Sequence, residues 1–217
     1  MALRIDFISD VVCPWCVVGL RSLEVALRRI GDAADVELHF EPFELNPDMG
    51  PEGEDVREHV ARKYGAAPER SDAVRQAIKQ HGALLGFEFG DRPDGRIWNS
   101  FDAHRLLCWA QTQASQHALK QELFSAYFTE GRNISDRGVL VELAESVGLD
   151  RAQARAVLEG DDFAAEVRAI EQKWRDNGIH AVPTIILNQR WMIQGAQPPE
   201  VFEEALRRVL AGTARPA

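Results

Sequence analysis

The first part of the chain alternates between hydrophobic and polar residues and then changes to a helical pattern. Residues 3–8 carry hydrophobic side chains at every second position, which is typical of a β-strand. From Pro14 onward the hydrophobic residues recur at helical spacing as far as Ile30, and the glycine that follows predicts the end of this helix. Residues 36–45 alternate again. The pattern therefore predicts a β-α-β unit, in which a right-handed helical connection joins two parallel strands.

A long stretch with little strand character comes next. Residues 46–54 are rich in proline and glycine and predict a loop. Helical spacing then predicts helices at 54–64, 68–86, 99–114, 117–129, 136–147, 151–158 and 161–177. Strand character returns at residues 184–187 and 191–193, which flank a tight turn and predict a hairpin. A last amphipathic helix is expected from the two prolines at 198 and 199.

This order of elements predicts an α/β protein with a mixed central sheet flanked by helices. The β-α-β unit and the terminal β-β-α unit are each too small to bury a sheet face alone, so we expect them to share one sheet. Residues 1–45 and 178–217 then form one discontinuous domain, and residues 46–177 form a large all-helical insertion.

Charge and composition narrow the range of partners and compartments. The 217 residues carry 25 basic and 34 acidic side chains, a formal net charge of −9 that disfavours nucleic acid and anionic membranes as partners. No apolar run approaches the roughly 20 residues that span a membrane. The N-terminus also lacks the pattern of a signal peptide, so we expect a cytoplasmic protein. In that compartment a close cysteine pair is usually catalytic or metal-binding.

Such a pair occurs in the stretch SDVVCPWCVVGL, where Cys13 and Cys16 enclose Pro14 and Trp15 between the first strand and the first helix. With Cys13 at the N-cap, Pro14 occupies the first helical position, which suits proline. A thiolate at Cys13 would accept a free backbone N–H of the first turn and would lie at the positive end of the helix dipole. The spacing also brings the two sulfur atoms within disulfide reach. This position favours Cys13 as the attacking nucleophile and Cys16 as the resolving thiol.

Two other interpretations of the pair stay open at this point. A structural zinc site needs four ligands, but the chain has no second CxxC and its six histidines are scattered. Two inert buried thiols are the other alternative. The third cysteine, Cys108, lies in a hydrophobic helical stretch and is expected to be packed as a small apolar residue. Pro183, in Val182-Pro183-Thr184, either starts a strand or follows a functional cis peptide bond.

Several motifs together resemble those of a known family. The matching residues are 8–16 (ISDVVCPWC), 99–100 with 103–107, 126–131 with 134–135, 178–179 ahead of 182–184, and 195–197. They extend over essentially the whole chain in the expected order. The chain resembles thioredoxin-fold oxidoreductases of the DsbA-like superfamily, and in particular its FrnE-type branch.

The resemblance implies a thioredoxin fold interrupted by a helical insertion, with a cis Pro183 facing the helix of the cysteine pair. It also implies Cys13 as nucleophile and Cys16 as resolving thiol. The backbone of Val182 would pair with an extended substrate peptide, and we expect Pro14, Trp15 and Thr184 to line the same substrate site. The Pro-Trp pair differs from the Pro-His of strongly oxidising periplasmic enzymes and from the Gly-Pro of thioredoxins, which leaves the redox potential open.

The expected function is thiol–disulfide exchange on protein or small-molecule disulfides. No metal or organic cofactor is expected beyond the redox-active Cys13–Cys16 pair, and glutathione is a candidate reductant. Asp6 and Asp10 are candidates for a buried proton-relay carboxylate. The alternative is a glutathione-dependent isomerase or transferase of the kappa-class or 2-hydroxychromene-2-carboxylate isomerase type, which typically has a serine in place of Cys13. Both a monomer and a homodimer agree with the sequence.

Overall fold

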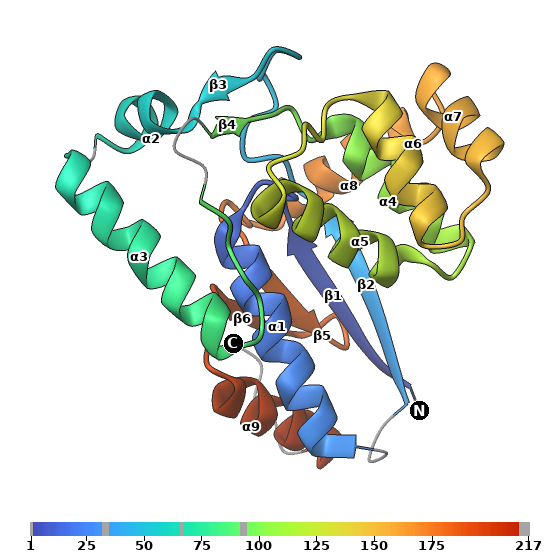
Figure 1. The fold of residues 1–217 in the computed structure, drawn as a ribbon. Helices are drawn as coiled ribbons and strands as arrows, with labels where there is room; N and C mark the ends of the chain where they lie inside the picture. The colour runs from blue at the N-terminus through green and yellow to red at the C-terminus, as the bar shows by residue number, and fades with distance from the viewer. Residues whose placement is uncertain (1, 32–34, 66, 92–94, 213–217) are drawn as a thin grey trace.

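The computed structural model describes residues 2–31, 35–65, 67–91 and 95–212 and contains one mixed sheet at its centre (Figure 1). The sheet consists of β1 (Leu3–Ser9), β2 (Val36–Pro42), β5 (Thr184–Leu187) and β6 (Trp191–Gln194). Their spatial order is β2-β1-β5-β6. β1 is parallel to β2, whereas β5 runs antiparallel to both β1 and β6. The expected mixed sheet is confirmed, because the first and last parts of the chain meet where β1 pairs with β5.

Helices cover both faces of this sheet. They are α1 (Pro14–Ile30) and α9 (Pro199–Leu210) on one face and α8 (Ala164–Asp176) on the other. Ile5 and Phe7 of β1 belong to the core cluster that contains the buried sides of α1 and α9. Ile8 points to the other face, where it packs with Trp174 of α8. Although α8 lies in the segment expected to be an insertion, it covers the sheet.

The chain between β2 and β5 is mainly helical. Its remaining helices are α2 (Val56–Tyr64), α3 (Pro68–Leu84), α4 (Phe101–Thr112), α5 (Gln116–Phe124), the π-helical turn η2 (Ser125–Thr129), α6 (Arg137–Ser146) and α7 (Arg151–Glu159). In Figure 1, α4 to α7 gather at the upper right of the sheet, and α3 runs beside α1.

The expectation of an all-helical insertion is wrong in one detail. Between the helices, β3 (Glu54–Asp55) pairs antiparallel with β4 (Arg96–Ile97). Strands of two residues are too short to produce an alternating pattern, so the sequence gives no sign of them. The expected helix at 117–129 is likewise divided into α5 and the π-helical turn.

The first helix forms as its sequence predicts. Its N-cap is Cys13, Pro14 is its first residue, and Gly31 ends it with φ +55°, a conformation that glycine adopts without steric cost. Arg28 and Arg29 in the last turn lie at the negative end of the helix dipole. The helix therefore begins at the cysteine pair and holds it at one end of the sheet.

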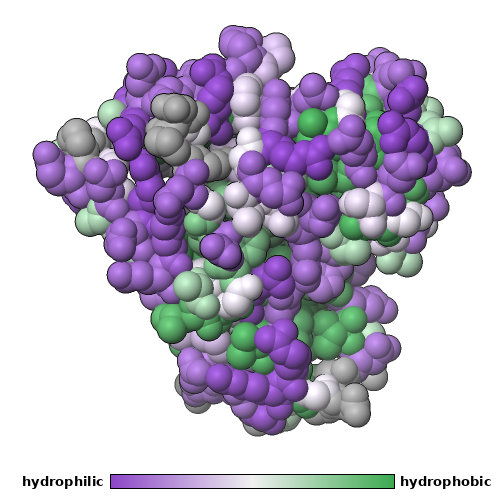
Figure 2. Space-filling model, in the orientation of Figure 1, coloured by the Kyte–Doolittle hydropathy of each residue, from purple (hydrophilic) through white to green (hydrophobic). Residues whose placement is uncertain are grey.

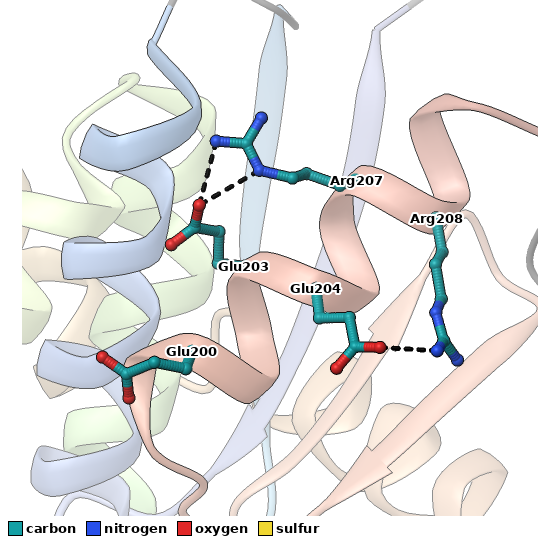
Figure 3. Close-up of a pocket in the computed structure, with 5 residues that line it drawn as sticks. All are labelled: Glu200, Glu203, Glu204, Arg207 and Arg208. Atoms are coloured by element: carbon teal, nitrogen blue, oxygen red, sulfur yellow. Dashed lines mark hydrogen bonds and ion pairs between the residues drawn. The ribbon is translucent and has the colours of Figure 1, made fainter.

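The surface of the face seen in Figure 1 is mostly hydrophilic, with separate apolar patches in its lower half and at its upper right (Figure 2). No helix in the described ranges is long and apolar enough to cross a membrane. On the outer side of α9, a shallow hollow is lined by carboxylate and guanidinium groups that form ion pairs along the helix (Figure 3). This hollow contains none of the site residues that the sequence predicts.

Candidate active site

The two sulfur atoms of the cysteine pair lie at the start of α1. Cys13 has extended backbone angles (φ −92°, ψ 111°), and its carbonyl accepts the N–H of Cys16 at 3.0 Å, which closes the first turn. The expected N-cap position of Cys13 is confirmed. In this thiol form the side chain of Cys13 makes no capping hydrogen bond, so the acceptance of a first-turn N–H by a Cys13 thiolate stays a prediction. Cys13 is a free thiol here, and its S–H points to the loop before β5 and not to the helix.

The thiol of Cys13 donates to the carbonyl oxygen of Val182 over 3.7 Å. The Val182–Pro183 peptide bond is cis, the geometry that the resemblance implies. The carbonyl of Pro183 accepts the N–H of Gly195 at 2.8 Å, which ties this loop to the end of β6. Gly19 of α1 lies against the ring of Pro183: an added Cβ there would be 3.0 Å from Pro183 Cγ. The loop before β5 thus packs directly on the first two turns of α1.

Cys16 lies deeper than Cys13. Its side chain is 0% exposed, whereas 4% of Cys13 reaches the surface. Burial raises the pKa of Cys16 well above its ordinary value, and the hydrogen bond and negative charge of Cys13 raise it further. The positive charge of Lys120 opposes this shift. Cys16 therefore stays protonated while it donates its hydrogen bond to the sulfur of Cys13.

The two aspartates considered as relay groups occupy different surroundings. Asp6 lies within β1 and binds the guanidinium of Arg4 at 2.6 Å. Asp10 lies in the turn that leads to Cys13, where it binds His104 Nε2 at 3.3 Å and accepts the N–H of Leu45 at 2.7 Å. Burial raises the pKa of the Asp10 carboxyl, but the hydrogen bond and charge of His104, together with hydrogen bonds from Leu45 and Ser100, lower the pKa overall. Asp10 is thus an ionised group that joins the turn to α4.

The residues expected to contact substrate do not all reach the surface. Pro14 and Trp15 are half-buried, and the indole of Trp15 lies 5.9 Å from the ring of His81 on α3. Thr184 is fully buried, and its hydroxyl donates to the carbonyl of Ala181 at 2.8 Å. The side chain of Thr184 therefore stabilises the turn before β5 and does not face a substrate. Trp15 lies beside the cysteine pair.

Sequence reasoning missed one group at this site. Lys120 of α5 is 0% exposed, and no hydrogen-bond acceptor of the described chain reaches its Nζ. Its charge interacts with Cys16, Asp10 and Cys13. The stretch HALKQELF around Lys120 looks like an ordinary amphipathic helix, so no local pattern separates this lysine from an exposed one.

A metal site and a reactive Cys108 are the two other kinds of chemistry to consider. Within the residues that the structure describes, no three or more His, Cys, Asp or Glu side chains gather where they could hold a metal ion. Burial raises the pKa of Cys108 to about 12, with smaller contributions from nearby carboxylates. The thiol of Cys108 is therefore protonated at any physiological pH and belongs to the packing of α4.

The fold and the cysteine pair together define the class of protein. Residues 4–207 match the family model described as a DSBA-like thioredoxin domain. Because this match covers nearly the whole chain, the chain belongs to the DSBA-like thioredoxin family, and the expected thioredoxin fold is confirmed.

The chain is also similar to individual proteins. The chain is 30% identical over 210 residues to the uncharacterized protein YwbO of Bacillus subtilis (strain 168), covering 95% of this chain and 96% of that protein. It is also similar to the crystal structure of the probable DsbA oxidoreductase SCO1869 from Streptomyces coelicolor, with 33% identity, a TM-score of 0.90, and coverage of 99% of this chain and 92% of that chain.

A third similarity extends to another enzyme class. The structure of a 2-hydroxychromene-2-carboxylate isomerase matches with a TM-score of 0.68 and 17% identity, over 98% of this chain and 100% of that chain. At this identity the likeness concerns the fold alone. The choice between the two classes of reaction therefore depends on the side chains of the site.

Proposed function

We propose that this protein is a thiol–disulfide oxidoreductase in which Cys13 attacks the substrate disulfide and Cys16 resolves the intermediate. The observation that carries the proposal is the pair of free thiols at the start of α1, with Cys13 beside the cis Val182–Pro183 bond. Of the two sulfur atoms, that of Cys13 is nearer the surface and adjoins the Val182–Pro183 loop. An isomerase that activates bound glutathione needs only one hydroxyl or thiol there, so a second cysteine in the same helical turn favours redox chemistry.

In the reducing direction the thiolate of Cys13 attacks one sulfur of the substrate disulfide. The substrate S–S bond breaks, a mixed disulfide with Cys13 forms, and the other substrate sulfur leaves as a thiolate. Cys16 then loses its proton and attacks the sulfur of Cys13, and the second substrate sulfur leaves. The enzyme loses two electrons as the Cys13–Cys16 disulfide forms, and the substrate becomes a dithiol. The opposite sequence oxidises a dithiol.

Substrate binding follows from the same hydrogen bond. In the reduced protein the carbonyl of Val182 accepts the thiol of Cys13. Once Cys13 is a thiolate or part of a mixed disulfide, its S–H is gone and this carbonyl becomes free. An extended substrate peptide can then donate a backbone N–H to Val182, as in strand addition. Pro14 and Trp15 flank the same place and supply apolar surface for the substrate.

A comparison of cysteine variants tests this function. The assay is a single turnover in which the pre-reduced enzyme, freed of dithiothreitol, reduces a protein disulfide. We expect Cys13→Ser to abolish catalysis and Cys16→Ser to stop after the first half-reaction, while Cys108→Ala serves as the matched control and keeps full activity. Full turnover by Cys16→Ser together with glutathione binding would contradict the proposal and favour the glutathione-dependent isomerase or transferase.

We propose glutathione as a reductant, and the cytoplasm as the site of action.

A further inference from the structure

Lys120 is the buried charged group that neither the fold nor the proposed exchange steps account for. Its side chain is 0% exposed, yet its ammonium group has no hydrogen-bond acceptor within the described chain. Burying an ammonium group without a partner is costly, and a methionine or leucine would fill the same space without that cost. A lysine in this position therefore calls for a role that needs its charge or its proton.

Two aromatic rings lie near Nζ, and the charges of the redox centre act on it. Nζ lies 4.8 Å from the ring centroid of Phe124 and 5.9 Å from that of Phe40 on β2. These cation–π contacts offset only part of the lost hydration. The negative groups whose charges act on Lys120 are Cys16, Asp10 and Cys13, with Cys16 the strongest. Asp10 is already bound by His104 of α4, which leaves the thiols as the groups that change charge beside Lys120.

The acidity of Lys120 suits proton exchange at neutral pH. Burial lowers the pKa of Lys120 to about 8, against the opposing charges of Cys16, Asp10 and Cys13. Both the ammonium and the neutral amine are therefore available near neutral pH, which is the condition that efficient acid–base groups meet. Cys16 has the complementary need, because its pKa is raised and it must lose a proton before it can attack.

We propose that Lys120 is the proton-exchange partner of Cys16, a role that rests on the proposed thiol–disulfide exchange. During resolution the neutral amine of Lys120 takes the proton of the Cys16 thiol and becomes an ammonium group beside the new thiolate. The thiolate then forms the bond to the sulfur of Cys13 and displaces the substrate thiolate. In the opposite direction, Cys16 leaves as a thiolate and receives the proton from Lys120. The relay is thus a lysine from α5, in place of the aspartates expected from the sequence.

The experiment separates the attack by Cys13 from the resolution by Cys16. Reduced protein in a Cys108→Ala background is mixed with dithionitrobenzoate, which releases one coloured thiolate when Cys13 attacks and a second when Cys16 resolves. We expect Lys120→Met and Lys120→Gln to slow the second release by about 100-fold, the usual contribution of a general base, and to slow the first release much less. The matched control is Lys173→Met, which removes an exposed lysine of α8 and leaves both phases unchanged.

The pH profile gives a second, independent readout that needs no lysine variant. In the parent protein the rate of the second release should rise with pH and level off near pH 8, where Lys120 becomes neutral. In the lysine variants it should continue to rise, because hydroxide must then deprotonate Cys16. Equal second-phase rates in parent and lysine variants, or a parent profile that does not level off, would overturn the role of Lys120. A parent that releases only one thiolate per pair would instead overturn the thiol–disulfide function itself.

Discussion

The contact between Gly19 and Pro183 makes a sharp prediction about how the loop before β5 is positioned. In Gly19→Ala the new Cβ would lie 3.0 Å from Pro183 Cγ and 3.6 Å from both Pro183 Cβ and Ala196 Cα. Nonbonded carbon atoms prefer about 3.5 to 4.0 Å. The loop must therefore move away from α1 by about 0.5 to 1 Å to accept one methyl group.

The two consequences of this substitution differ in size. Alanine within a helix is favoured over glycine by about 1 kcal/mol, whereas overpacking costs about 1 to 3 kcal/mol, so the net loss of unfolding free energy should not exceed about 2 kcal/mol. The exchange rate should fall much further, because a misplacement of about 1 Å at a reacting centre can cost about 100-fold. Val182 would no longer lie where it contacts Cys13.

Urea denaturation and the rate of thiol–disulfide exchange measure these two effects on the same protein. Gly138→Ala of α6 is the control, since its Cβ would meet only the carboxylate oxygen of Asp136, at 3.0 Å. The control should keep the wild-type exchange rate. If Gly19→Ala is folded and exchanges as fast as the control, the loop is not held by this contact and the reasoning is refuted.

Two further predictions concern buried ionisable groups. Burial and the charge of Glu171 raise the pKa of Glu44 from 4.5 to about 8. The unfolded chain therefore releases this proton at lower pH than the folded chain. Relative to Glu44→Gln, the wild type should lose unfolding free energy as pH rises from about 5 to 8. Urea denaturation measures this free energy at each pH, and an equal change with pH in both proteins would contradict the raised pKa of Glu44. The thiol of Cys108, with its pKa of about 12, should resist iodoacetamide in the native protein while Cys13 reacts. Peptide mass spectrometry checks this, and alkylation of Cys108 before Cys13 would show the packing to be wrong.

The parts of the site that the sequence could predict depend on local patterns. The strand before Cys13, the helix from Pro14 and the cap at Gly31 are each encoded by a few neighbouring residues. For the same reason the N-cap position of Cys13 was predictable. The position of Val182 beside Cys13 depends on pairing between distant strands, and it was accessible only through the family resemblance.

Other parts of the site have no local pattern to reveal them. Lys120 is buried because α5 packs on β2 and binds Glu24 of α1 through His117 and Gln121, and helical periodicity cannot tell which face such a partner will cover. Thr184 follows a proline, and prolines usually lie at the start or edge of a sheet, where neighbouring side chains are exposed. The sheet nevertheless buries Thr184 completely. The sequence also cannot show that α8 turns back onto the sheet, where Trp174 and Ile8 share a core.

The most direct test of the central claim is the identity of the trapped intermediate. Cys16→Ser removes the resolving thiol, so a disulfide substrate should remain bound through Cys13. The measurement is peptide mass spectrometry of this variant after reaction with a peptide disulfide, without reducing agent. We predict one mixed disulfide per chain, located on Cys13, which dithiothreitol releases. A substrate attached to Cys108, or no covalent adduct from a folded Cys16→Ser protein, would contradict the assignment of Cys13 as the nucleophile.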